Sequence, residues 1–454
     1  MSLSAVVLAA GAGTRMKSKK PKVAHEILGK PMVSYAIDAL KEAGANKVSV
    51  VVGHGKEIVA PLCEGVEICE QKNMLGTGDA VMCAKEVFKE TSGSILVTYG
   101  DCPLITSNTL KQLVKKREEE NAVACVLTTI LDDPFGYGRI VRDENGEVLK
   151  NVEEKDCTNE QRLIKECNTG FYCFDVNELF SALEKVTNDN AQGEFYLTAV
   201  IEVLTGEGKR VVSIMSKDKD ELLGVNSREQ LCDAQKIMQK RINKRHMAQG
   251  VSIWDSTSTF ISPEVELSSD VEIMPNTILL GKTKIGEDCL VGPNTRLNNV
   301  CVGKGCVIDE TIGIDAKIED NVKTGPRCYL RPGAHLLQGS KAGTCVEIKK
   351  STIGKNSKVP HLSYVGDATI GENANLGAGT ITCNYDGENK HETKIGNNAF
   401  IGSSTMLVSP VNVGNDVVIG AGSVITEDVP DNALALGRGR QVNKIGRVKK
   451  KEEE

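Results

Sequence analysis

The sequence predicts an α/β domain with a largely parallel sheet, followed by a parallel β-helix. Strand-like apolar segments alternate with helical segments in the first half, and an aliphatic residue returns at every sixth position late in the chain. Alternating strands and helices are typical of a parallel sheet covered by helices. A repeat as short as six residues requires stacking, because one unit cannot bury its apolar face alone.

The strands and helices of the first half follow one another regularly. Strands are expected over residues 6–9, 47–52, 95–98 and 122–129, and helices over residues 31–43, 80–90 and 110–120. A long helix is expected over residues 227–247, where apolar residues recur at helical spacing. The predicted organisation is a first domain at 1–226, a linker helix at 227–250, and a second domain at 251–454 with a basic tail.

The six-residue repeat is clearest from residue 395 onward. Its aliphatic positions are Ile395, Ile401, Leu407, Val413, Ile419 and Ile425. Glycine follows most of them, and a small or β-branched residue comes four positions after most of them. This spacing suits a flat-sided coil with one inward side chain per side. Segments 325–341 and 383–394 break the spacing, so we expect both to leave the coil as loops on a binding face.

The length, net charge and cysteine content of the chain limit the classes of protein to which it can belong. A chain of 454 residues suggests two or three domains, and its net charge of −6 argues against a nucleic-acid coat. The 15 cysteines are odd in number and lack paired metal-ligand spacing, which favours reduced thiols in the cytoplasm. The apolar start has no basic segment before it and is read as a buried strand. No apolar stretch is long enough to span a membrane.

A glycine-rich loop follows the first expected strand. Gly11 and Gly13 would let backbone N–H groups approach phosphate oxygens, and Arg15 could add charge-assisted bonds. Lys22 could return a second cation to the same phosphates. Taken alone, Gly11 and Gly13 are more typical of an ordinary glycine-rich turn than of a phosphate loop, and Lys22 of an exposed lysine.

Two further segments carry candidate ligands. Gln71 and the glycine-rich segment 76–78 form a second polar loop that would suit the edge of a nucleobase. Asp101 directly follows the strand expected at 95–98, so its carboxylate should face the crevice at the carboxyl end of the sheet. There it could hold Mg²⁺ together with substrate phosphates. A lone aspartate after a strand is, however, more often a turn residue.

The motifs of both halves, taken in order, resemble one known family. They are LAAGAGTRM, PKV, LGTGDA, TYGDCPL, GYGRI, NTG, NAQGEFYLT, GVNS, YLRPGA, VEIKK, HLSYVGD, NLGAGTITCNYDG and IGSSTMLV. The chain is similar over nearly its whole length to the bifunctional N-acetylglucosamine-1-phosphate uridyltransferases and glucosamine-1-phosphate acetyltransferases of bacterial cell-wall precursor synthesis. This resemblance implies a Rossmann-like nucleotidyltransferase domain and a left-handed parallel β-helix built of hexapeptide repeats.

The resemblance also implies residue roles in the first domain. The residues implied to contact the nucleotide and its phosphates are Leu8, Ala9, Ala10, Gly11, Arg15 and Lys22. The residues implied to read uracil are Gln71, Gly76 and Thr77. The residues implied to surround the sugar and ribose are Tyr99, Gly100, Gly138, Glu153 and Asn168. Asp101 and Asn226 are implied to bind Mg²⁺.

For the second domain, the resemblance places a catalytic base at His361. Histidine side chains generally titrate near neutral pH, which suits proton removal from an amine that attacks a thioester. The residues implied to hold the amino-sugar phosphate are Arg331, Lys349, Tyr364 and Asn375. The residues implied to contact acetyl-CoA are Ala378, Ser403, Ala421 and Arg438, with Asn384 and Tyr385 near the reacting groups. Glu347 is a candidate to orient the imidazole of His361.

These roles predict two reactions on one chain. The second domain would acetylate glucosamine 1-phosphate with acetyl-CoA. The first would transfer UMP from UTP to N-acetylglucosamine 1-phosphate and release pyrophosphate. The family suggests a homotrimer with small-molecule substrates and neither a nucleic-acid nor a membrane partner.

Two alternatives stay open from the residues alone. One is a sugar nucleotidyltransferase of other specificity whose β-helix is not catalytic. The other is a scaffold that binds a nucleotide-sugar without turnover. In the tail, Arg438 and Arg440 could meet the phosphates of CoA, while the residues from Lys449 onward would be a solvated end.

Overall fold

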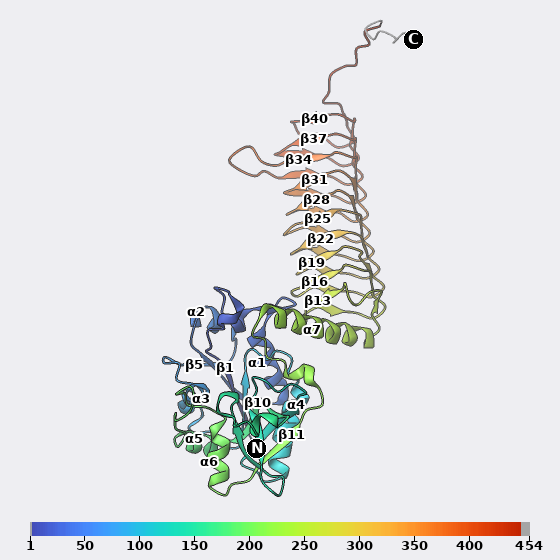
Figure 1. Cartoon of the computed structure of the whole chain (residues 1–454). Helices are drawn as coiled ribbons and strands as arrows, with labels where there is room; N and C mark the ends of the chain where they lie inside the picture. Colours follow the sequence, from blue (N-terminus) through green and yellow to red (C-terminus); the bar gives the residue numbers. More distant parts are fainter. Residues whose placement is uncertain (1, 446–454) are drawn as a thin grey trace, which may run out of the picture. The chain divides into compact units, whose positions relative to one another are not determined.

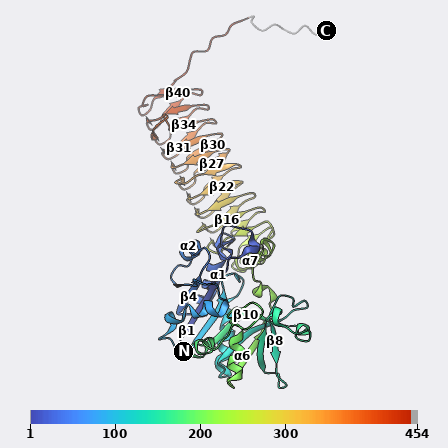
Figure 2. The same cartoon turned by 60° about the vertical axis from the view of Figure 1, so that its left-hand side comes forward.

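The computed structural model describes residues 2–445 and comprises two compact units that divide between Met238 and Gln239. The basic residues Arg447 and 449–451 of the tail lie outside the described residues. The first unit is an α/β domain, and the second consists of stacked strands (Figures 1 and 2). No helix within residues 2–445 is both long and apolar enough to cross a membrane.

The first unit contains a nine-stranded mixed sheet with helices between its strands. Its strands are β1 (Leu3–Ala9), β4 (Lys47–Val52), β5 (Glu67–Glu70), β6 (Ser94–Tyr99), β7 (Ala124–Ile130), β8 (Arg139–Arg142), β9 (Val148–Val152), β10 (Glu166–Asp175) and β11 (Val211–Met215). A separate short hairpin is formed by β2 (Glu26–Ile27) and β3 (Lys30–Pro31). The helices are α1 (Met32–Ala43), α2 (Lys56–Val59), α3 (Thr77–Met82), α4 (Ser107–Glu119), α5 (Val176–Leu183), α6 (Ala199–Gly206) and α7 (Arg228–Ala248). Short 3₁₀ helices are η1 (Thr14–Met16), η2 (Lys22–Ala24), η3 (Ala60–Leu62), η4 (Lys85–Phe88), η5 (Glu154–Asp156), η6 (Gln161–Leu163) and η7 (Lys219–Leu222).

The main strand order is β11-β7-β10-β6-β1-β4-β5, with β8 and β9 joined to it through β10. All pairs along this main path are parallel except those of β10, which runs antiparallel to β6 and β7. The expectation of a largely parallel sheet therefore holds for the main path, whereas β8 and β9 join through antiparallel pairs. The expected helix at 80–90 is wrong in its bounds, since α3 ends at Met82 and only the 3₁₀ helix η4 follows.

Alternate side chains of β1 explain why both faces of this sheet are covered. Val7 packs into an apolar cluster with side chains of α1 and α4, while Val6 packs into a second cluster with side chains of α3, α5 and α6. Successive residues of a strand point to opposite faces, so an uninterrupted apolar strand requires helices on both sides. The carboxyl end of β1 is then left free to carry a ligand-binding loop.

The second unit is a left-handed parallel β-helix with three stacked sheets, one for each side of the coil. The first sheet contains β12 (Ser252–Ile253), β15 (Glu272–Ile273), β18 (Leu290–Val291), β21 (Val307–Ile308), β24 (Lys323–Thr324), β27 (Lys341–Thr344), β30 (Lys358–His361), β33 (Asn375–Leu376), β36 (Phe400–Ile401), β39 (Val418–Ile419) and β41 (Leu434–Ala435). The second contains β13 (Phe260–Ile261), β16 (Ile278–Leu280), β19 (Arg296–Asn298), β22 (Thr311–Ile314), β25 (Cys328–Leu330), β28 (Glu347–Lys349), β31 (Tyr364–Gly366), β34 (Ile381–Cys383), β37 (Met406–Val408) and β40 (Val424–Ile425). The third contains β14 (Glu266–Leu267), β17 (Lys284–Ile285), β20 (Cys301–Val302), β23 (Lys317–Ile318), β26 (His335–Leu336), β29 (Thr352–Ile353), β32 (Ala368–Ile370), β35 (Thr393–Ile395) and β38 (Val411–Val413).

The six-residue repeat corresponds to one side of this coil. Its aliphatic residues from Ile395 to Ile425 are all buried, as the sequence predicted. The glycines that follow them stand where neighbouring coils approach closely. A Cβ at Gly402 would lie 2.4 Å from the backbone nitrogen of Ala421, and one at Gly354 would lie 2.0 Å from the carbonyl oxygen of Gly371. Only glycine fits at these corners without moving the next coil.

One of the two expected loops is present and the other is not. Residues 384–392 leave the coil between β34 and β35 and project from the stack (Figure 1). Segment 325–341, in contrast, stays in the coil as β25 and β26 with regular partners above and below. The prediction for 325–341 was wrong because coils of somewhat different length still stack. Lys284 pairs with Cys301, for example, and Cys301 pairs with Lys317.

The second half of α7 closes the first coil of the β-helix. Gln239 donates its amide hydrogens to the carbonyl oxygens of Ser256, Thr257 and Thr259 at 3.2, 3.0 and 2.8 Å. Asn243, which is fully buried, donates to two of the same oxygens. The sequence predicted a separate linker helix at 227–250. In the structure this helix contributes residues to each compact unit, because its polar side chains satisfy the open end of the coil.

An inward residue of the coil should matter more for stability than its outward neighbour. We expect Leu297→Ala, at a fully buried position, to destabilise the β-helix by about 2–5 kcal/mol, since it removes buried methyl groups and leaves a cavity. Arg296→Ala, at the exposed neighbouring position, should change stability by less than about 0.5 kcal/mol. Urea unfolding followed by circular dichroism would measure both, and equal effects would contradict an inward Leu297.

Candidate active sites

The glycine-rich loop lies at the carboxyl end of β1, next to the end of β6. Leu8 of β1 pairs with Tyr99 of β6, so the loop and Asp101 meet at one edge of the sheet. Gly13 has a φ of 61° in the left-handed region, and a Cβ there would lie 2.5 Å from Cβ of Lys22. Glycine at position 13 therefore lets η2 pack closely against the loop, which brings Lys22 to the same edge.

Two neighbouring cavities open at this edge of the sheet. The first, of about 320 Å³, we call the loop cavity. Of the predicted residues, it is lined by Leu8, Ala9, Ala10, Gly11, Lys22, Gln71, Gly76, Thr77, Tyr99 and Asp101. The second, of about 570 Å³, we call the wide cavity. Of the predicted residues, it is lined by Arg15, Thr77, Tyr99, Asp101, Gly138, Glu153, Asn168 and Asn226.

The structure thus brings together nearly all of the residues predicted for the first site. Thr77, Tyr99 and Asp101 line both cavities and form their common wall. Gly100 is the exception, because it lines neither cavity and a Cβ there would lie 3.2 Å from Val23. Glu194 also lines both cavities. It was not predicted, although it stands within the quoted NAQGEFYLT segment.

Between the two cavities lies a compact group of one cation and two oxygen ligands. The ammonium of Lys22 donates to a carboxylate oxygen of Asp101, and to the amide oxygen of Asn226 at 2.8 Å. The backbone N–H of Val225 donates to the carbonyl oxygen of Asp101 at 2.8 Å, which fixes the segment carrying Asn226 beside it. The sequence predicted Lys22 for phosphate, whereas in this structure it contacts the two predicted metal ligands.

The amide of Gln71 is held in place at the side of the loop cavity. Its nitrogen donates to the carbonyl oxygen of Gly76 at 3.0 Å and to the carboxylate of Asp79 at 2.7 Å. A Cβ at Gly76 would lie 2.5 Å from the carbonyl oxygen of Phe195. The second glycine-rich loop is thereby pinned against residues 194–195, and Gln71 presents a fixed polar edge.

Glu153 forms part of the wall of the wide cavity. Thr198 and Asn151 donate to its carboxylate at 2.9 and 3.3 Å. Burial raises the pKa of Glu153, and these two donors oppose that rise.

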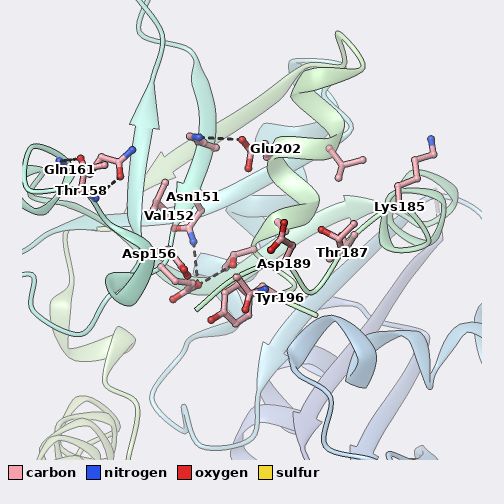
Figure 3. A pocket seen from close by; sticks show the side chains of 17 residues that line it. Asn151, Val152, Asp156, Thr158, Gln161, Lys185, Thr187, Asp189, Tyr196 and Glu202 are labelled. Carbon is pink, nitrogen blue, oxygen red and sulfur yellow. Dashed lines mark hydrogen bonds and ion pairs between the residues drawn. The ribbon is translucent and has the colours of Figure 1, made fainter. Parts of the chain in front are cut away.

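A third cavity, of about 630 Å³, shares Glu153, Tyr196 and Thr198 with the wide cavity. Asn151 and Tyr196 stand on its wall (Figure 3).

An ion pair between buried Arg139 and half-buried Glu154 holds residues 136–138, which line the wide cavity. Arg139 is only 2% exposed, and its guanidinium donates to Glu154 at 2.7 Å and to the carbonyl oxygen of Tyr137. Glu154 also accepts from the backbone N–H of Gly136 at 3.2 Å. We call this arrangement the Arg139–Glu154 clamp. It holds the backbone of Gly136 and Tyr137, and neither of its side chains was predicted from the sequence.

The second group of predicted residues lies on the β-helix, on two of its three sheets. Lys349 and Tyr364 lie on β28 and β31 of one sheet, and His361 and Asn375 lie on β30 and β33 of another. Leu330 pairs with Ile348, so Arg331 and Lys349 come from equivalent positions of consecutive coils. Arg331 donates to Glu347 at 2.8 Å. The expectation that Glu347 orients His361 is therefore wrong for this structure, because the Glu347 carboxylate is held by Arg331. Within residues 2–445 the His361 ring makes no hydrogen bond.

The projecting loop contributes to this second group. The buried amide of Asn384 donates to Asp367 at 2.5 Å, and the ammonium of Lys349 lies 3.9 Å from the same carboxylate. Close contact with Lys390, followed by burial, lowers the pKa of Lys349. Three cationic side chains, those of Arg331, Lys349 and Lys390, thus gather here. Lys390 was not among the residues predicted from the sequence.

His361 begins a column of residues along one edge of the coil. Backbone N–H groups of Gly379, Ser404 and Gly422 donate to the carbonyl oxygens of His361, Ala378 and Ser403 at 3.4, 2.7 and 2.8 Å. These bonds place His361, Ala378, Ser403 and Ala421 at the same corner of four consecutive coils. Arg438 follows the last strand, β41, and is exposed. Asn375 lies on β33, which pairs with the strand of His361.

Comparison with known proteins supports both halves of this description. A model of the MobA-like NTP transferase domain matches residues 5–194, and one of the bacterial transferase hexapeptide (six repeats) matches residues 392–427. The chain is 50% identical to the bifunctional protein GlmU of Caldanaerobacter subterraneus subsp. tengcongensis, over 99% of this chain and 98% of the relative. The chain belongs to the GlmU family. It is also 48% identical to the GlmU proteins of Thermoanaerobacter pseudethanolicus and Brevibacillus brevis, over 99% and 98% of its length and 98% and 96% of theirs.

Membership of the GlmU family confirms the resemblance seen in the motifs. The chain is a bifunctional enzyme of UDP-N-acetylglucosamine synthesis that joins a uridyltransferase to an acetyltransferase. A GlmU protein needs two separate sites, and the structure supplies a group of predicted residues on each unit. The alternatives of a silent β-helix and of a binding scaffold without turnover are set aside.

Proposed function

We propose that the first unit transfers a uridylyl group within the loop cavity and the wide cavity, and that the second acetylates an amino sugar at His361. The observation that supports the first assignment best is the meeting of Gly11, Lys22 and Asp101 at one strand edge. In the loop cavity Gly11 and its neighbours would receive the triphosphate of UTP, with Gln71 and Thr77 on the uracil. In the wide cavity Glu153 and Asn168 would bind hydroxyl groups of the N-acetylglucosamine 1-phosphate and ribose.

The protein contributes to uridylyl transfer mainly by positioning the substrates and stabilising charge. The phosphate oxygen of the sugar attacks the α-phosphorus of UTP, the bond to the β-phosphate breaks, and pyrophosphate leaves with the electron pair. The loop holds the triphosphate and the wide cavity holds the sugar phosphate, which keeps the reacting atoms in line. Arg15, exposed at the edge of the wide cavity, would neutralise charge on the departing pyrophosphate.

The donor atoms fit a divalent cation, and we propose Mg²⁺ with Asp101 and Asn226 as its protein ligands. Their oxygens already converge on one cation, the ammonium of Lys22. Carboxylate and amide oxygens suit Mg²⁺, which usually takes one or two carboxylates and completes its shell with substrate phosphates. Within residues 2–445 no cluster of three or more His, Cys, Asp or Glu side chains could hold a metal without such help. When bound, the ion would supply positive charge to the phosphate oxygens.

For the second reaction, His361 would act as general base on glucosamine 1-phosphate. It takes a proton from the amine as the nitrogen attacks the thioester carbonyl carbon, and the carbon–sulfur bond breaks to release CoA. Arg331, Lys349 and Lys390 would bind the phosphate of the amino sugar. Tyr364 lies on β31, which pairs with the strand of Lys349, and Asn375 lies on β33, which pairs with the strand of His361; both would contact the sugar.

The column of residues that begins at His361 would bind acetyl-CoA along its length. Ala378, Ser403 and Ala421 are small residues at one corner of successive coils, so an extended ligand can lie along them. Arg438 would meet the phosphates of CoA at the far end. Asn384 and the exposed Tyr385 of the projecting loop would lie near the acetyl group. A transferable acetyl group at the His361 end of this column would be near the amine.

We further propose a homotrimer that works in the cytoplasm. Phe400, Val418 and Leu434 stand in register on β36, β39 and β41 and are 52%, 44% and 66% exposed. An exposed apolar column of this kind favours association. The His361 column is also open to solvent on one chain, and a second β-helix beside it would enclose the reacting groups.

A paired assay of the whole chain tests both activities. It measures release of CoA from acetyl-CoA and glucosamine 1-phosphate, and release of pyrophosphate from UTP and N-acetylglucosamine 1-phosphate. We expect both products. Pyrophosphate without CoA would contradict the acetyl-transfer site, and CoA without pyrophosphate would contradict the uridylyl-transfer site.

The Arg139–Glu154 clamp should position the sugar-phosphate substrate. We expect Glu154→Gln to raise the KM for N-acetylglucosamine 1-phosphate by roughly tenfold and to change kcat less, because the loop 136–138 loses an ionic anchor while the reacting phosphates keep theirs. Glu160→Gln, at an exposed position nearby, is the matched control. An unchanged KM, or equal effects of the two variants, would contradict a positioning role.

A further inference from the structure

The proposed transfer reaction does not explain why Lys22 contacts both Asp101 and Asn226. The Lys22 ammonium donates to both oxygens that would bind the divalent ion. Lys22 and Asp101 are only 15% and 14% exposed, so solvent screens this contact weakly. A metal ion that binds Asp101 and Asn226 together must therefore displace the ammonium.

The packing of the aliphatic part of Lys22 limits the positions that its ammonium group can reach. The Cβ of Lys22 stands against Gly13 of the phosphate loop, at 2.5 Å from the position that a Cβ on Gly13 would occupy. Lys22 also lines the loop cavity itself. A lysine side chain has four rotatable methylene groups and carries a compact charge, so its ammonium can change partner while its stem stays packed.

We propose that Lys22 is an exchangeable counterion, which balances Asp101 in the free enzyme and passes to the nucleotide phosphates when the metal arrives with them. The inference rests on the proposed metal role of Asp101 and Asn226. In the free enzyme, Lys22 keeps the largely shielded carboxylate of Asp101 from standing unpaired, which would be costly. It also makes the metal bind weakly unless phosphate is present to receive the ammonium.

Binding of Mn²⁺ to the nucleotide-free chain tests this exchange without any turnover. Free Mn²⁺ is measured by electron paramagnetic resonance with the full-length protein, for the wild type, Lys22→Gln and Lys22→Arg. We expect Lys22→Gln to bind Mn²⁺ at least about tenfold more tightly than wild type, because a positive charge near the ion is removed. Lys22→Arg, which keeps the charge, should show no such gain. Lys20→Gln, on an exposed lysine that pairs with Glu26, is the matched control.

Thermal unfolding gives an independent readout. In EDTA, Lys22→Gln should unfold at a lower temperature than wild type, and Mn²⁺ should raise its midpoint by more than it raises that of wild type. Equal or weaker Mn²⁺ affinity of Lys22→Gln would overturn the exchange. Asp101→Asn separates this failure from a failure of the proposed site. If Asp101→Asn binds Mn²⁺ as tightly as wild type, the metal assignment itself is wrong.

Discussion

Asp101→Asn is expected to lower uridylyl transfer by at least about a thousandfold and to leave acetyl transfer within about twofold of wild type. Removal of one preorganised charge-stabilising group commonly costs a hundred- to a thousandfold in kcat, and Asp101 also lines both cavities of the first site. The two activities should separate because the acetyl-transfer residues belong to the other unit. Pyrophosphate and CoA release from the same preparation measure them together.

The control for this prediction is Asp132→Asn, at an exposed carboxylate of the same unit. It should leave both activities unchanged. If Asp101→Asn lowered both activities equally, the residue would be structural rather than part of the uridylyl-transfer site. Uridylyl transfer at the wild-type rate would remove Asp101 from the machinery altogether.

His361→Ala is expected to produce the opposite pattern. Acetyl transfer should fall by roughly a hundred- to ten-thousandfold, the range that a general base contributes, while UDP-sugar formation from preacetylated substrate stays unchanged. The side chain is exposed and makes no hydrogen bond within residues 2–445, so its removal should cost little stability. Thiol release from acetyl-CoA with glucosamine 1-phosphate is the direct measurement.

His335→Gln is the matched control, since His335 lies on the same β-helix and bonds to Glu319 at 2.9 Å. It should retain acetyl transfer. A His361→Ala variant with full acetyl-transfer rate would remove His361 as the base. A loss of acetyl transfer accompanied by a lower unfolding temperature would instead indicate a structural role.

Much of the first site could be predicted because its residues follow strands. The end of a parallel strand is the place where ligands bind, so a glycine-rich loop after residues 6–9 and an aspartate after residues 95–98 point to one crevice. The Arg139–Glu154 clamp could not be predicted in the same way. An arginine and a glutamate 15 positions apart carry no signal until the hairpin of β8 and β9 brings them together.

In the β-helix, too, some features could be predicted from the sequence and others became visible only in the structure. Its six-residue repeat predicted which aliphatic residues point inward, because each side of the coil repeats the same local environment. The rhythm failed at 325–341, where strands stay in register although the coil length changes. It also could not show that Glu347 pairs with Arg331 rather than with His361, since a contact between coils depends on register.

The sequence by itself determined the two architectures, the family and the identity of most candidate ligands, because periodicity and ordered motifs are local properties of the chain. The tertiary structure decided which charges meet. Lys22, Asp101 and Asn226 are far apart in the chain, and only the folded sheet shows that the ammonium rests on the two oxygens and not on open solvent. Electrostatic partners depend on distance in space, and sequence separation does not encode that distance.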